Sequence, residues 1–222
     1  SASGVALIFV GAEGQNSIAV APGANGRLTP ADVRKARRVI ALADAVVVQL
    51  ETPMDTVREA AEQAAAAGVP VVLNPAPART LPSRLLRLVT VLTPNETEAE
   101  LLSGVAVRND RSAGCAADVL LDKGPRIVVI TLGARGALVA TKEGHQIVPS
   151  FPVRAVDTTA AGDVFNGALT VALAEGKPLT EAARFANAAA ALLVTRLGAQ
   201  PSAPTRRAVE SLRSRGPRRV NP

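Results

Sequence analysis

The stretch DTTAAGDVFNGAL, residues 157–169, leads from an extended segment into a long helical pattern. Apolar side chains recur there at the spacing of one helix face, at Phe165, Leu169, Ala172 and Leu173. The small residues 160–162 therefore stand where the helix begins. The first N–H groups of a helix lack partners within it and lie at the positive end of its dipole. A phosphate could approach the backbone closely at this point.

Asp163 follows these small residues directly. A carboxylate beside an anion site could take a proton from an attacking hydroxyl. This pairing suits phosphoryl transfer, which depends mainly on positioning and charge stabilisation. The alternative is an ordinary acid at a helix start, preceded by a tight turn of small residues. The spacing alone leaves both interpretations open.

The same stretch resembles the C-terminal signature of the ribokinase family of carbohydrate kinases. In that family the second Asp of the signature is the base that deprotonates the sugar hydroxyl, and the backbone before it forms an anion hole. The resemblance implies that Asp163 is the catalytic base, in contact with sugar and nucleotide. It also implies that Ala160, Ala161 and Gly162 form the anion hole for the transferred phosphate of ATP.

The length and composition are typical of one globular domain, with 222 residues, 48% of them hydrophobic and 20% charged. Residues 1–222 are therefore predicted to form a single domain. No apolar run is long enough to span a membrane, and no leader-like pattern opens the sequence. Cys115 is the sole cysteine, which excludes an internal disulfide and fits the cytoplasm. We expect it to be a buried small apolar residue rather than a nucleophile.

The formal net charge is +6, a value that raises the question of nucleic-acid binding. Aromatic residues make up only 2% of the chain, and Trp and Tyr are absent, so platforms for stacking bases are missing. Basic residues concentrate near the end of the chain, and residues 214–222 are predicted to be a solvated basic tail. We therefore expect no nucleic-acid partner.

Strand and helix patterns alternate along most of the chain. Strands are predicted at 5–10, 17–20, 45–50, 71–73, 89–92, 126–130, 137–141 and 146–148. Helices are predicted at 29–43, 52–67, 85–88, 93–102, 110–121 (with 112 as the alternative start), 160–175, 180–192 and 204–212. This alternation predicts a doubly wound α/β fold, a mostly parallel sheet with helices on both faces. The segment 45–50 is expected to be covered on both faces. Ligands in such folds bind beyond the carboxyl ends of the strands.

Glu51 follows the predicted strand 45–50. Its carboxylate could accept hydrogen bonds from sugar hydroxyls, or it could be an acid at the start of the next helix. The segment Gln49-Leu50-Glu51 resembles one in ribokinases whose Glu touches ribose, which implies a substrate contact for Glu51.

Asn95 and Glu98 lie three residues apart on one helix turn. They could form a capping pair, or they could orient water around Mg²⁺, which keeps much of its hydration shell. Their Asn-x-x-Glu spacing resembles the ribokinase motif that supports the magnesium–phosphate network. The resemblance implies a magnesium role for both, and a nucleotide contact for Asn95.

A glycine-containing segment follows the predicted strand 126–130. From the sequence alone it could be a hairpin turn or a loop that lets a nucleotide approach the backbone. It resembles the Thr-Leu-Gly-x-x-Gly segment that lines the ATP site of ribokinases. The ATP contacts implied by this resemblance are Thr131, Leu132, Gly133, Ala134, Arg135 and Gly136, with Asn187 at a further matching position.

Oxygen-bearing groups flank the stretch and the end of the helix that follows it. Carboxylate, carbonyl and hydroxyl oxygens suit a hard cation. Ribokinases place a monovalent cation here, so potassium is implied by resemblance alone. The matching positions are Asp157, Thr159, Leu193, Arg196, Gly198 and Ser202.

The resemblance covers nearly all 222 residues, but about the first third of a full-length relative has no counterpart. Residues 5–20 are predicted to be a remnant of the family's β lid, which we place within residues 1–25. The chain begins at Ser1, without an initiator Met. We expect it to bind ATP or ADP and to phosphorylate D-ribose poorly, because part of the sugar grip is absent.

Two rival hypotheses remain at this point. One is a truncated nucleotide-binding module that pairs with itself, as a homodimer, through an exposed sheet edge. The other is a related sugar or nucleoside kinase, such as a fructokinase.

Overall fold

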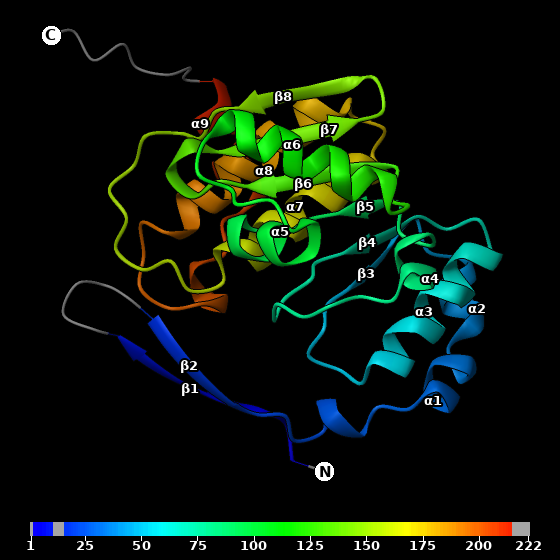
Figure 1. Ribbon diagram of the computed structural model, residues 1–222. Coiled ribbons are helices and arrows are strands. Elements are labelled where there is room, and N and C mark those ends of the chain that lie inside the picture. The colour runs from blue at the N-terminus through cyan, green and yellow to red at the C-terminus, as the bar shows by residue number, and fades with distance from the viewer. Residues whose placement is uncertain (1, 11–15, 215–222) are drawn as a thin grey trace, which may run out of the picture.

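The computed structural model describes residues 2–10 and 16–214 of the chain (Figure 1). Its body contains a six-stranded sheet in the order β3-β4-β5-β6-β7-β8. The strands are β3 (Val46–Val48), β4 (Val71–Leu73), β5 (Val91–Leu92), β6 (Ile127–Thr131), β7 (Ala137–Thr141) and β8 (Gly144–Val148). The first four strands run parallel, and β7 and β8 are antiparallel to their neighbours. The predicted mostly parallel sheet is confirmed.

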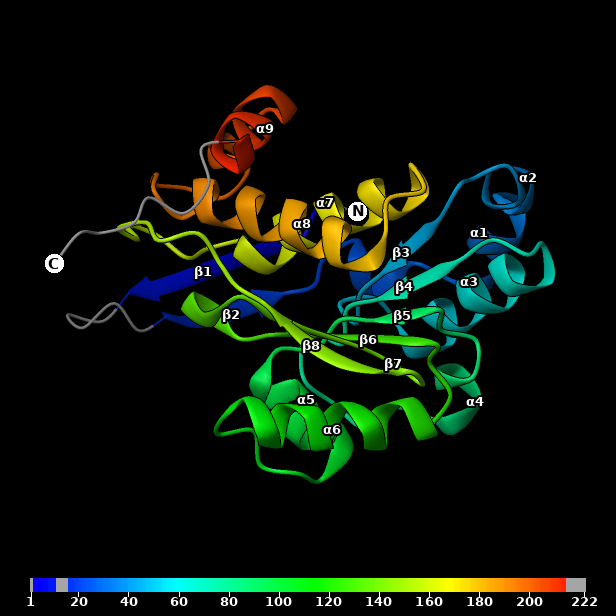
Figure 2. The same cartoon turned by 90° about the horizontal axis from the view of Figure 1, so that it is seen from above.

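Helices cover both faces of this sheet, as Figure 2 shows most plainly for α5 and α6 on one side and α7 and α8 on the other. The first layer contains α3 (Met54–Ala66), α4 (Ser83–Leu86), α5 (Glu96–Ser103) and α6 (Asp110–Asp122). The second contains α7 (Ala161–Ala174) and α8 (Leu179–Leu193), and α9 (Arg206–Ser214) packs against α8. Each layer buries its own apolar core against the sheet. The doubly wound prediction is therefore correct.

The predicted helix 29–43 is two short helices, α1 (Pro30–Lys35) and α2 (Arg37–Ala41). Its start is as predicted, because Thr29 forms a capping box with Asp32. The break falls among cations spaced three and four residues apart, such as Arg34 and Arg38, and like charges at that spacing weaken a helix.

The start of α8 also differs from the prediction. The sequence predicts a helix over 180–192, whereas α8 begins one residue earlier, at Leu179 behind Pro178. The fixed φ of proline suits the entry into a helix. Thr180 lies inside the first turn, where its hydroxyl accepts a hydrogen bond from Gln146 at 2.5 Å.

Strand β3 is shorter than predicted and is not covered on both faces. Val47 keeps 49% of its surface exposed, whereas its register partner Val72 belongs to the core beneath α7 and α8. The reason is position, since β3 is an edge strand of the described sheet, and the core beneath α7 and α8 includes Val72 of β4 but no residue of β3.

A separate two-stranded ribbon precedes the body and stands off from it in Figure 1. It consists of β1 (Val5–Val10) and β2 (Asn16–Ala21), which correspond to the predicted strands 5–10 and 17–20 and pair antiparallel. Residues 11–15, between the two strands, lie outside the described residues. So does most of the predicted basic tail, because the description ends at residue 214.

Cys115 is exposed, contrary to the prediction that it is buried. It lies on α6 in line with Arg111, Asp118 and Asp122, which form the solvent-facing stripe of that helix. Periodicity along the helix, rather than residue type, decides its exposure. In the described part of the chain, no helix combines the length and apolarity that crossing a membrane requires.

Candidate active site

The start of α7 has an unusual backbone. Its N-cap residue, Ala160, adopts a left-handed conformation with φ 61° and ψ 14°, and no side chain caps the helix. Among the described residues it is the only non-glycine with positive φ. That conformation costs an L-residue about 1–2 kcal/mol, and such strain is typical of functional sites.

The strained turn exposes backbone donors. The Ala161 amide donates to the Thr158 carbonyl at 3.2 Å. Within residues 2–10 and 16–214, no hydrogen bond is found from the amides of Ala160, Gly162 or Asp163. Amides without partners at the N-terminus of a 14-residue helix form a donor group suited to an anion.

Asp163 lies on the first turn of α7 and is exposed. Its Oδ1 accepts a hydrogen bond from Nε2 of Gln49 at 3.4 Å, across 114 residues of sequence. The carboxylate is thus at the surface, beside the end of β3, and not deep among aliphatic side chains. The sequence reasoning missed Gln49 as a neighbour of Asp163, and no local pattern pointed to it.

The carboxyl end of β3 also carries Glu51, which is exposed. Gln49 and Glu51 both line a recess of about 250 Å³ bounded by β3 and α3. The candidate base and the predicted sugar contact therefore lie at one edge of the sheet.

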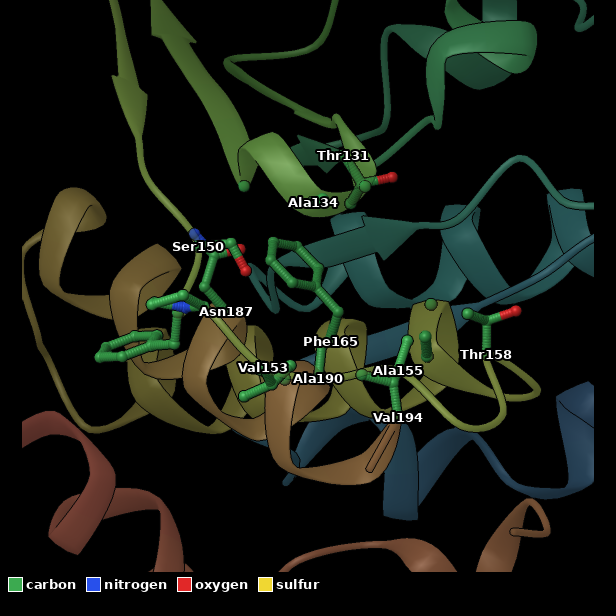
Figure 3. Close-up of a pocket in the computed structure, with 17 residues that line it drawn as sticks. Thr131, Ala134, Ser150, Val153, Ala155, Thr158, Phe165, Asn187, Ala190 and Val194 are labelled. Atoms are coloured by element: carbon green, nitrogen blue, oxygen red, sulfur yellow. The ribbon is translucent and has the colours of Figure 1, made fainter. Parts of the chain in front are cut away.

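A larger cavity of about 380 Å³ adjoins the start of α7 (Figure 3). Its walls come from the loop after β6, the segment before α7, and helices α7 and α8. It is lined by Thr131, Gly133, Ala134, Gly136, Ser150, Phe151, Pro152, Val153, Ala155, Thr158, Ala161, Gly162, Phe165, Asn187, Ala190, Ala191 and Val194. Most of these side chains are apolar, which suits a flat aromatic base.

The loop after β6 fits closely against the strand end of β8. Gly136 has φ 103°, and a Cβ at this position would lie 2.2 Å from the Val148 carbonyl oxygen. Only glycine fits here. Leu132 is buried and does not line the cavity, although the resemblance named it as an ATP contact.

Arg135 belongs to the same loop but is absent from the cavity lining. It forms ion pairs with Glu96 at 2.6 Å and with Asp110. These bonds tie the loop to the starts of α5 and α6.

Asn187 is buried at the far side of the cavity. Its Nδ2 donates to the carbonyls of Val148 at 2.8 Å and Pro149 at 3.3 Å. Its amide nitrogen thus anchors the backbone leading into the cavity wall, and the side chain also lines the cavity.

Asn95 and Glu98 form a capping box on α5. The Glu98 amide donates to Asn95 Oδ1 at 2.8 Å, and the Asn95 amide donates to Glu98 Oε2 at 2.9 Å. Burial raises the pKa of the Glu98 carboxyl. An isolated bridge between Asn95 and Thr131 places this helix start beside the end of β6. The capping alternative is realised, and Glu98 Oε1 carries no bond within the described residues.

Asp157 links the segment before α7 to the loop after α8. Its carboxylate accepts hydrogen bonds from the Thr159 and Gly198 amides, each at 2.9 Å. The Thr159 hydroxyl, followed by these amides, lowers the pKa of the Asp157 carboxyl. Ser202 is buried and donates to the Leu197 carbonyl at 2.7 Å.

Two further predicted cation ligands lie at the end of α8. The buried Leu193 offers a carbonyl that accepts the Arg196 amide at 3.1 Å, and the Arg196 side chain is exposed. In the described ranges, no group of three or more His, Cys, Asp or Glu side chains could hold a metal ion.

This arrangement defines a class of protein. A mostly parallel sheet whose edge offers a helix start with free amides, an adjacent carboxylate and an apolar cavity is suited to phosphoryl transfer. The profile described as pfkB family carbohydrate kinase matches residues 2–206. The chain belongs to the pfkB family of carbohydrate kinases.

Ribokinases are prominent among its relatives. A ribokinase of Haemophilus influenzae is 51% identical over 204 residues, which are 92% of this chain and 67% of that protein. A crystal structure of a Thermotoga maritima ribokinase has a TM-score of 0.86 at 40% identity, over 95% of this chain and 69% of that one. An Arabidopsis thaliana ribokinase complexed with ribose and ATP has a TM-score of 0.85 at 33% identity, over 94% of this chain and 68% of that one.

The chain is therefore a sugar kinase of the ribokinase type, a phosphotransferase that uses an alcohol group as acceptor. It spans about two thirds of the length of these relatives.

Proposed function

We propose that the protein transfers the γ-phosphate of ATP to the 5-hydroxyl of D-ribose, with Asp163 as the base. One observation carries this proposal: an exposed carboxylate stands on the same helix turn as amides without partners. The amides of Ala160 and Gly162, joined by that of Ala161 once it releases the Thr158 carbonyl, stabilise the charge on the transferred phosphoryl group. Asp163 accepts the hydroxyl proton. Glu51, at the neighbouring strand end, accepts hydrogen bonds from the sugar.

The nucleotide occupies the cavity of about 380 Å³, with its base between the apolar walls and its phosphates toward the start of α7. Thr131, Gly133, Ala134 and Gly136 form one wall and Asn187 the other. Support comes from the Arabidopsis relative, whose structure is of a complex with ribose and ATP. Arg135 acts from behind the loop through its ion pairs rather than by lining the cavity.

Magnesium accompanies ATP and neutralises charge on its phosphates. Asn95 and Glu98 fit a water-mediated role, because their mutual bonds leave Glu98 Oε1 free and Mg²⁺ retains most of its water. A direct cage of protein ligands does not fit the described donor set.

A monovalent cation, potassium, is proposed near Asp157. The carboxylate already joins two loops, and hydroxyl and carbonyl oxygens lie within the same loops. The proposed ligand positions are Asp157, Thr159, Leu193, Arg196, Gly198 and Ser202.

We also propose that two copies associate through the β1–β2 ribbon. Val5, Leu7 and Val20 are more than half exposed, at 58%, 59% and 54%. A two-stranded ribbon alone is marginally stable in water, so burial of these side chains against a second copy would stabilise it. We place the enzyme in the cytoplasm, where ATP is available and the exposed Cys115 stays reduced.

The 222 residues are expected to bind ATP or ADP yet to phosphorylate ribose slowly. Among the described residues, Glu51 and Asp163 are the proposed sugar contacts, and a sugar oriented by so few groups reacts slowly. The alternative is that this chain serves as a nucleotide-binding or self-associating module without kinase activity.

The test compares the 222-residue chain with the protein expressed from its complete coding sequence. Calorimetry measures ATP binding, and ADP release is assayed with ribose, 2-deoxyribose, fructose and adenosine, in K⁺ and in Na⁺. We expect ribose-dependent ADP release from the complete protein, with ribose 5-phosphate as product by NMR.

Preference for fructose or adenosine would identify a sister kinase instead, and no acceptor-dependent ADP release would refute the proposed reaction. Rapid turnover by the 222-residue chain would contradict the incomplete sugar grip. A strict monomer by light scattering would contradict association through the ribbon.

A further inference from the structure

We propose that Gln49 is a positioning residue for the catalytic carboxylate: its side-chain amide holds Oδ1 of Asp163 and leaves Oδ2 to receive the sugar proton. The proposal rests on the proposed role of Asp163 as base. It assigns to the end of β3 a function in catalysis in addition to the sugar contact of Glu51.

The contact itself is the first evidence. Gln49 Nε2 lies 3.4 Å from Asp163 Oδ1, and in the described chain no other hydrogen bond reaches this carboxylate. An ionised carboxylate only accepts hydrogen bonds, so the amide nitrogen rather than the amide oxygen of Gln49 faces it. The two carboxylate oxygens are therefore not equivalent, because one is held by a donor and the other is free.

The backbone around Gln49 is fixed on both sides. The Val48 carbonyl accepts the Asn74 amide at 3.0 Å, and the Leu50 amide donates to the Ala76 carbonyl at 2.8 Å. The Leu50 carbonyl accepts a guanidinium hydrogen bond from Arg79 at 2.8 Å. The residues on either side of Gln49 are therefore fixed by hydrogen bonds to the segment 74–79.

The bond to Asp163 shows the direction of the Gln49 side chain. Leu50 is fully buried in the core beneath α3 to α6, whereas the amide of Gln49 reaches the start of α7. The segment 74–79 therefore supports Asp163 indirectly: it holds the backbone on both sides of Gln49, and Gln49 holds the carboxylate.

This placement predicts which kinetic constant responds. Asp163 is exposed, and without a partner its carboxylate would sample several rotamers on the helix surface. A base acts on the hydroxyl proton only as the reaction proceeds, so misorientation lowers kcat more than it raises KM. A bond to a charged group supports at most a loss of about a hundredfold, and its length and exposure point to about tenfold.

The experiment uses Gln49→Met and Gln49→Glu in the protein expressed from its complete coding sequence. Methionine keeps the volume and removes the donor, whereas glutamate keeps the shape and replaces the donor with a second carboxylate. Gln63→Met is the matched control, because Gln63 bonds Glu59 within α3 and touches neither proposed substrate.

We expect kcat of Gln49→Met to fall about tenfold, with KM for sugar and ATP changed by less than about threefold. The kcat of Gln49→Glu should fall further than that of Gln49→Met. The acid limb of its pH–rate profile should move to higher pH, because adjacent carboxylates resist joint ionisation. Gln63→Met should match the unaltered enzyme. Melting temperature and ADP affinity confirm that each variant is folded.

Gln49→Met retaining more than half of the original kcat would overturn the proposal, as would a loss confined to KM. An unaltered acid limb in Gln49→Glu would also overturn it. These outcomes are distinct from failure of the proposed function, in which the unaltered protein itself shows no acceptor-dependent ADP release.

Discussion

Replacing Asp163 with Asn separates the two roles assigned to the start of α7. Asparagine keeps the size and planarity of the side chain and removes its basicity. General-base catalysis contributes about 10²–10⁴-fold, so we expect kcat to fall by about 10³-fold, equivalent to about 4 kcal/mol of lost transition-state stabilisation. The residual rate reflects the amides of the helix start, which the substitution leaves in place.

The affinity for ADP should not fall with kcat in Asp163→Asn. Asp163 is exposed beside the amides that would hold the phosphates, and two like charges about 4 Å apart in water repel by about 1 kcal/mol. Removing the carboxylate should leave ADP affinity unchanged or raise it by up to about fivefold. Isothermal calorimetry at low and high salt measures this, and the gain should shrink at high salt because the repulsion is screened.

Stability should change little. The acid in the first turn interacts favourably with the helix dipole by about 0.3–1 kcal/mol. Asp55→Asn is the matched control, since Asp55 is also an exposed acid in the first turn of a long helix, α3. Both variants should lose a similar small amount of unfolding free energy, and only Asp163→Asn should lose kcat.

Asp163 is not the general base if Asp163→Asn retains more than about a tenth of the original kcat, because general-base catalysis contributes more than that. The two roles are not separate if ADP binding is lost together with activity. In that case Asp163 would be needed for the site to hold the nucleotide.

Three further predictions concern the surroundings of the site. Arg135→Met should weaken ADP binding by about three- to tenfold, because it frees the loop after β6 from Glu96, and it should cost less than about 1 kcal/mol of stability. Calorimetry will measure the affinity and denaturant titration the stability. Unchanged ADP affinity would show that the Arg135 ion pairs do not hold the loop for the nucleotide. Glu98→Gln should be at least as stable as the original protein at about pH 7, because burial raises the pKa of Glu98 and ionisation of this carboxyl disfavours the fold. The difference in stability between the two proteins should vanish as pH falls toward the ordinary carboxyl range. Melting curves from about pH 4 to 8 will test this. Asp157→Ala should lower the melting temperature above about pH 4 and lower it less in stronger acid. The reason is that hydrogen bonds lower the pKa of Asp157, so its contribution to stability disappears as pH falls through that lowered value. The variant should also lose activation by K⁺ over Na⁺, and a melting difference that persists unchanged at about pH 2 would contradict the stabilising role of the carboxylate.

Local patterns in the sequence were sufficient for several features whose whole cause lies within one segment. The capping box at Asn95 and Glu98 and the apolar face of α7 each depend on residues within two or three turns. The alternation of strands and helices was sufficient for the doubly wound architecture, since short connections and right-handed crossovers leave few other arrangements. The same local reasoning was wrong for Cys115, where the phase of α6 overrode the usual burial of cysteine.

Relations across the chain were beyond such patterns. The Gln49–Asp163 contact joins positions 114 residues apart, and the cavity collects its walls from segments after β6, before α7 and within α8. The left-handed Ala160 is likewise a product of the assembled fold, because alanine has no intrinsic preference for that conformation and surrounding contacts must hold it there.

Periodicity, turn chemistry and one long motif are thus sufficient to indicate the family, the architecture and the candidate base. They cannot say which carboxylate oxygen is free, which loop residues line the cavity, or which face of an outer strand lies open to water. Those properties depend on distances between segments far apart in the chain, and such distances exist only once the sheet has brought the ends of its strands to a common edge.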